Sequence, residues 1–135
     1  MEPVIPDFAG RTITIIKLDY SLYLWTDDNW VIQLAGPVLV SIAGSAPTQI
    51  DVSVADSPLP AELDGVVGST ITNVLVTEDG HLGVQLGDRQ LSVRAADMYE
   101  AWEIAGPNGE RLISTPGGEL THFPPVRPNA TAGDP

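Results

Sequence analysis

The stretch MYEAWEIAGPNGERLISTPGGELTHF, residues 98–123, decides the fold of this chain. It consists of short apolar runs separated by the turn sequences Gly-Pro-Asn-Gly and Pro-Gly-Gly. An Asn-Gly pair between apolar runs is a strong hairpin signal, because both residues tolerate the positive φ of a tight turn. Trp102 and Ile104 alternate with Glu103 and Ala105, so one face of this strand is apolar. We therefore expect two or three short strands here, with Trp102 as the core anchor.

Similar runs, rich in β-branched and aromatic residues, fill the rest of the chain, which indicates further strands. Residues 21–34 form the clearest of these patterns, a hairpin whose two arms alternate on either side of Asp27-Asp28-Asn29. The other predicted strands cover residues 11–18, 38–42, 49–54, 66–77, 81–86 and 89–95.

One short helix is predicted over Pro58–Asp64. Ser57 offers a capping hydroxyl directly before a proline, and proline is favoured at the first helical position. Leu59 and Leu63 lie four residues apart on one face, and Gly65 is a natural stop. A helix of this length is expected to plug or cover a sheet.

The predicted fold class is mainly β: an antiparallel sandwich or partly open barrel of about eight to ten short strands with one short helix. Residues 1–10 are predicted to be a loose lead-in and 11–123 a single β-rich domain. Residues 124–135 have few apolar side chains to bury, so we expect a disordered tail.

The chain of 135 residues has 6 basic and 18 acidic residues, a formal net charge of −12, and no cysteine. Disulfides and thiolate metal sites are therefore excluded. Nucleic acid and anionic membrane surfaces are disfavoured partners, because their phosphates would be repelled. A basic protein partner is permitted. The N-terminal residues lack the basic and apolar regions of a secretory signal, so we expect a cytoplasmic location.

Candidate catalytic groups are few, because the chain has only His81 and His122. His81 follows Glu78 and Asp79, but a carboxylate-rich turn of this kind is typical of a solvated hairpin tip. The Asp27-Asp28-Asn29 turn lacks the alternating twelve-residue loop and terminal Glu of an EF-hand calcium site. No nucleophile elbow or phosphate-binding loop is present in the sequence. We expect no enzyme activity, no metal and no cofactor.

Tyr23 and Trp25 are the most suggestive side chains. If Leu22 and Leu24 face the core, these two aromatic residues face away from it on the same strand. Such a strand is either covered on both sides or presents an aromatic patch. The covering element would be the short helix or the N-terminal segment. The alternative is a possible interaction surface made of Tyr23, Trp25, Asp27 and Asp28, used by a homodimer or by a basic protein.

Three classes of function follow from these patterns. The first is a non-enzymatic protein-interaction module of the immunity or adaptor kind, which fits the negative charge and the aromatic residues. The second is a small β-barrel that binds an apolar small molecule. The third is a hydrolase-type enzyme that uses His122 or His81 with carboxylates.

The segment from Tyr99 to Leu120 resembles an uncharacterised family of small actinobacterial domains. Its members share a C-terminal EAWE-type strand followed by a Gly-Pro turn and a Pro-Gly-Gly turn. The similarity extends over most of residues 12–123. It implies no activity, cofactor or catalytic residue.

Overall fold

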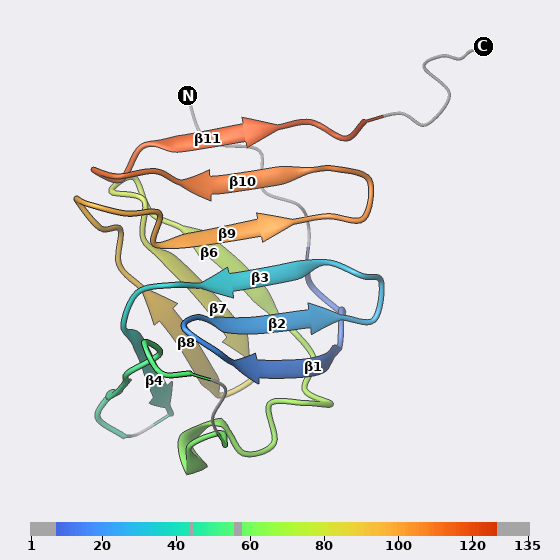
Figure 1. Ribbon diagram of the computed structural model, residues 1–135. Helices are drawn as coiled ribbons and strands as arrows, with labels where there is room; N and C mark the ends of the chain where they lie inside the picture. The colour runs from blue at the N-terminus through green and yellow to red at the C-terminus, as the bar shows by residue number, and fades with distance from the viewer. Residues whose placement is uncertain (1–7, 44, 56–57, 127–135) are drawn as a thin grey trace.

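The chain folds into two antiparallel β-sheets packed face to face, as seen in a computed structural model that describes residues 8–43, 45–55 and 58–126 (Figure 1). The strands of the smaller sheet run steeply across the back of the larger one (Figure 1). Crossed packing of this kind is one of the two common ways in which sheets stack. The predicted β-sandwich is therefore confirmed.

The larger sheet has six strands in the order β1-β2-β3-β9-β10-β11. It combines the hairpins from the two ends of the chain, which join where β3 pairs with β9. The bounds are β1 Ile13–Leu18, β2 Leu22–Thr26, β3 Val31–Leu34, β9 Trp102–Ala105, β10 Arg111–Ser114 and β11 Leu120–Phe123.

The smaller sheet has five strands in the order β5-β4-β8-β7-β6 and comes from the middle of the chain. The chain passes from the larger sheet into the smaller one after Gly36-Pro37 and returns before Ala101. A hydrogen bond joins these two connections: the Ala35 N–H donates to the Ala101 carbonyl at 2.8 Å. The bounds are β4 Val38–Ile42, β5 Thr48–Ile50, β6 Asn73–Val76, β7 Leu82–Leu86 and β8 Arg89–Val93.

The core lies between the sheets and follows the alternation of the strands. In β2 and β3 every second residue is buried, as the hairpin pattern predicts. Trp102 is only 1% exposed, which confirms its predicted place in the core. Its indole Nε1 donates to the Gly80 carbonyl at 2.7 Å, so a side chain of the larger sheet is bonded to a turn of the smaller one.

The predicted turns form where Asn and Gly supply positive φ. Asn29 has φ 68° in the β2–β3 turn, and Gly109 has φ 88° in the β9–β10 turn. Both turns are short, since β2 ends at Thr26 and β3 begins at Val31, while β9 ends at Ala105 and β10 begins at Arg111. The strands that flank each turn therefore pair with each other.

Of the two predicted forms, a sandwich or a partly open barrel, the structure has the sandwich. The described strands form two separate sheets rather than one closed sheet. Apolar side chains from both sheets form the core between them.

The short helix is reduced to one 3₁₀ turn, Ala61–Leu63. Proline at position 60 disfavours helical geometry at Leu59, so a helix cannot begin at Pro58. Ser57, the predicted cap, lies outside the described residues. Leu63 is 1% exposed and adds to the core rather than covering a sheet face. No helix in the described ranges has the length and apolar character to cross a bilayer.

Several predicted boundaries shift; the strand expected over residues 49–54, for example, is Thr48–Ile50. The strand expected over residues 66–77 is regular only from Asn73, because Gly68 has φ 92° and breaks the extended run. Phe8, which the sequence analysis assigned to the loose lead-in, is 1% exposed. Its ring packs edge-on against Trp30, with 5.3 Å between the ring centres. At the other end, Val126 donates its N–H to the Asn108 carbonyl at 2.7 Å. Residues 1–7 and 127–135 of the predicted lead-in and tail lie outside the described ranges.

Candidate functional site

The outer face of the six-stranded sheet carries Tyr23 and Trp25, as the alternation of β2 predicts. Both side chains are half-buried, and their rings stack at 5.8 Å with an interplanar angle of 23°. Each ring of the stacked pair shields part of the other from solvent. Gln33 Nε2 donates a hydrogen bond to the Tyr23 hydroxyl at 3.5 Å. The 3₁₀ turn proposed as a cover contributes Leu63 to the core instead.

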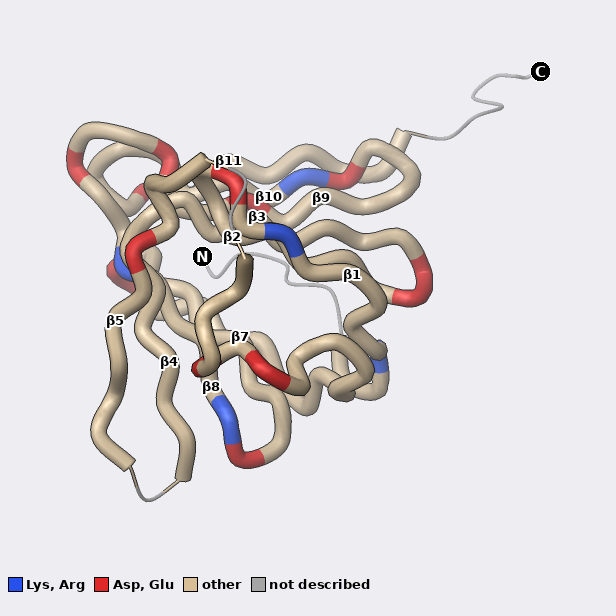
Figure 2. Tube along the Cα trace, turned by 60° about the horizontal axis from the view of Figure 1, so that its bottom comes forward, with Lys and Arg blue, Asp and Glu red and all other residues tan. Residues whose placement is uncertain are grey.

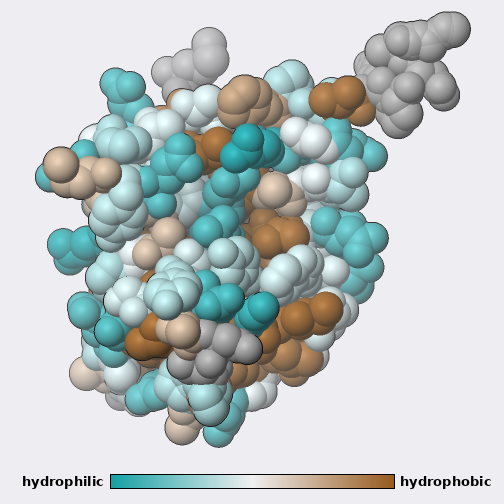
Figure 3. Space-filling model, viewed as in Figure 1, coloured by the Kyte–Doolittle hydropathy of each residue, from teal (hydrophilic) through white to brown (hydrophobic). Residues whose placement is uncertain are grey.

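Trp25 belongs to an apolar row that crosses four strands. The strand registers place it opposite Ile15 of β1 on one side and Val31 of β3 on the other, and Val31 lies opposite Ala105 of β9. Ile15 is 55% exposed, so this row is open to solvent at the β1 edge. Figure 3, which looks onto this face, shows apolar patches separated by polar side chains.

The row continues through a charged residue to the opposite edge. Ala105 lies opposite Arg111, which lies opposite Phe123 of β11. The Arg111 guanidinium sits 5.7 Å from the centre of the Phe123 ring and donates through Nε to Glu103 at 2.7 Å. That bond raises the pKa of Arg111 above its ordinary value. Arg111 and Glu103 therefore compensate each other's charge at this end of the row, although the chain as a whole is acidic.

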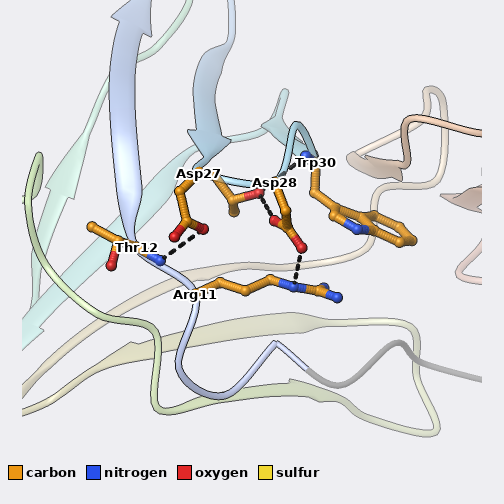
Figure 4. A network of polar contacts seen from close by, with 6 residues as sticks. Arg11, Thr12, Asp27, Asp28 and Trp30 are labelled. Atoms are coloured by element: carbon orange, nitrogen blue, oxygen red, sulfur yellow. Dashed lines mark hydrogen bonds and ion pairs between the residues drawn. The ribbon is translucent and has the colours of Figure 1, made fainter.

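The two aspartates predicted at the rim differ in their surroundings (Figure 4). Asp28 pairs with Arg11 at 2.7 Å and accepts a hydrogen bond from the Thr26 hydroxyl at 2.6 Å. Arg11 also stacks over the rings of Phe8 and Trp30. Asp28 thus fastens the chain before β1 to the β2–β3 turn.

Asp27 is exposed and accepts a long hydrogen bond of 3.4 Å from the Thr12 N–H. It makes no ion pair with any basic residue that the structure describes. Of the two predicted rim charges, only that of Asp27 is left uncompensated beside the aromatic pair.

Replacing Asp28 by asparagine is expected to lower the free energy of unfolding by less than about 1 kcal/mol, because Asp28 is 46% exposed and its ion pair is screened by water. The loss should shrink further at high salt. Urea unfolding at low and high salt measures it, with Asp88→Asn on the β7–β8 turn as the control. A salt-independent loss of several kcal/mol would contradict this view of the ion pair.

A second candidate site is a cleft between the free edges of the two sheets, where β6 and β11 are the edge strands. Its volume is about 1280 Å³. Val76, Leu112 and Leu120 give it an apolar floor, and both histidines line it. The structure thus brings together two residues that are 41 positions apart in the sequence. The carboxylate side chains around the cleft are Glu78, Asp79, Asp97 and Glu119.

The two imidazoles have different environments. His81 is half-buried, and its Nδ1 accepts the Ala95 N–H at 2.8 Å, which leaves the other ring nitrogen, Nε2, to carry the proton. His122 is exposed at the mouth of the cleft. Among the described residues, no three His, Asp or Glu side chains come close enough to hold a metal ion.

The sequence had no signal for this cleft, because its walls come from two hairpin turns that are distant in the chain. The β6–β7 and β10–β11 turns meet backbone to backbone at Gly80 and Gly118. The Gly117 N–H also donates to the Ala96 carbonyl at 2.8 Å. The Pro-Gly-Gly motif that marked a turn in the sequence is therefore also a contact between the sheets.

No curated protein and no solved structure is significantly similar to this chain. A family model covers nearly all of the two-sheet domain described above. The actinobacterial source and the C-terminal motif expected from the resemblance stay predictions. The match over residues 4–124 shows that the chain belongs to DUF6188, a family of unknown function.

Proposed function

We propose that this domain is a non-enzymatic protein-interaction module of the cytoplasm that binds a basic protein through the outer face of its six-stranded sheet. The observation that supports this most is the solvent-facing apolar row from Ile15 through Trp25 to Ala105, beside the stacked Tyr23. Tyrosine and tryptophan are the residues that most often anchor protein interfaces.

Charge favours a basic protein over a second copy of the chain. Two copies would each bring a formal net charge of −12, and their mutual repulsion would oppose association. Acidic side chains lie on many of the turns around the molecule, and basic ones are few (Figure 2). Asp27, uncompensated next to Trp25, would steer a basic partner toward this face and raise the association rate more than the affinity.

The test is the double change Tyr23→Ser and Trp25→Ser. A basic partner captured by the parent chain is first identified and purified, and its affinity is then measured against each variant. We expect the double change to weaken binding at least about tenfold, since truncated interface aromatics commonly cost 2 kcal/mol or more. Binding by the parent should also weaken as salt rises.

The matched control is Val67→Ser with Leu75→Ser, which removes two side chains that are 50% and 53% exposed elsewhere on the molecule. This control should bind as the parent does. The proposal fails if the aromatic double variant unfolds, since the two rings would then belong to the core. It also fails if both double variants bind equally, or if sedimentation shows that the face serves self-association.

A further inference from the structure

The cleft between β6 and β11 has the lining of a binding site that is separate from the outer sheet face. Four carboxylates surround an apolar floor, and none of them pairs with a basic residue in the part of the chain that the structure describes. Among the described residues no lysine or arginine lines the cleft, and the two that adjoin lining residues in the sequence, Arg94 and Arg111, are exposed. The cleft therefore combines uncompensated negative charge with an apolar surface.

The histidines add hydrogen-bonding groups to this lining. With its Nδ1 occupied by the Ala95 N–H, His81 keeps Nε2–H as a donor. His122, exposed at the mouth, has two ring nitrogens for which the described residues provide no hydrogen bond. A neutral imidazole can accept a hydrogen bond from an ammonium group, so His122 suits the same ligand charge as the carboxylates do.

We infer that the cleft binds an aliphatic ammonium ion, whose methylene chain lies on the floor of Val76, Leu112 and Leu120 while its charged end meets the carboxylates and His122. The volume of about 1280 Å³ exceeds that of ordinary small-molecule pockets, so an extended chain fits. A free diamine and a lysine side chain of a protein present this same chemistry.

Cadaverine (1,5-diaminopentane) is the probe for a free diamine, and the peptide Gly-Lys-Gly is the probe for a lysine side chain of a protein. Each is titrated into the full chain while the imidazole NMR signals of His81 and His122 are followed. We expect saturable shifts of both signals with at least one of the two probes, and no shift with 1-pentanol, which has the apolar chain without the charge.

Glu78→Gln with Glu119→Gln removes two charges from the cleft at nearly constant shape. It should raise the apparent dissociation constant of the bound probe at least about tenfold, because two close charge interactions are lost. Asp64→Asn with Asp88→Asn removes two exposed charges outside the cleft lining and should leave that constant within about twofold of the parent's. Equal effects of the two double variants would overturn the inference, as would shifts that never saturate.

Discussion

Replacing Trp102 by alanine is expected to lower the free energy of unfolding by about 3–5 kcal/mol, the range for truncating a buried aromatic side chain. Trp102 is 1% exposed between the two sheets, so its removal leaves a cavity that the surrounding strands can fill only in part. Domains of this size are commonly stable by roughly 5–15 kcal/mol, so the loss is a large share of the total.

Part of this loss in the free energy of unfolding comes from a broken hydrogen bond. The Trp102 indole donates to the Gly80 carbonyl at 2.7 Å in a buried contact, and alanine would leave that carbonyl without its donor. Trp102→Phe separates the two contributions, because phenylalanine keeps most of the ring packing but cannot donate. We expect Trp102→Phe to cost about 1–3 kcal/mol, the penalty for an unsatisfied buried acceptor together with a small void.

Urea unfolding of the parent and both variants measures these losses, with the slope of the transition checked for constancy. Loss of less than about 1 kcal/mol in Trp102→Ala would contradict the role of this residue as an anchor between the sheets. If Trp102→Ala fails to fold, Trp102→Phe still gives a measurable value.

The strands and hairpins of this fold were readable from the sequence because they depend on local signals. Alternation in residues 21–34, with Asn29 at positive φ, specifies the β2–β3 hairpin without help from the rest of the chain. The same holds for β9 and β10 on either side of Gly109. Local pattern also placed Tyr23 and Trp25 on the outer face, because one strand alternates its side chains whatever its neighbours are.

The order of the strands was not readable, because it depends on contacts between distant segments. β3 ends at Leu34 and its partner β9 begins only at Trp102, so the two strands are far apart in the sequence. No local pattern specifies that pairing. The pairing of Asp28 with Arg11 was missed for the same reason: nothing in the sequence shows that the chain before β1 returns to the β2–β3 turn. The cleft depends on both sheets and was likewise hidden.

The contact between the two hairpin turns at this cleft leads to the second large expected effect. Gly118→Ala should lower the free energy of unfolding by about 2–5 kcal/mol. Gly118 has φ 88°, where an L-residue costs about 1–2 kcal/mol. A Cβ there would also lie 2.5 Å from the Asp79 carbonyl oxygen, and forcing the turns apart adds about 1–3 kcal/mol.

Gly117→Ala is the matched control, because Gly117 has almost the same φ of 90° but a Cβ there would meet no atom of the described residues within 4 Å. The difference between the two variants in urea unfolding therefore isolates the contact between the turns from the backbone strain. We expect Gly118→Ala to be less stable than Gly117→Ala by about 1–3 kcal/mol.

Gly80→Ala tests the same contact from the other side, since its Cβ would collide with the Gly118 carbonyl. It should resemble Gly118→Ala in stability, and the double variant should cost less than the sum of the two, because either change alone already separates the turns. Equal stability of Gly118→Ala and Gly117→Ala would mean that the two turns move apart freely. In that case the β6–β7 and β10–β11 hairpins would not hold each other in place, and the cleft between them would have no fixed shape.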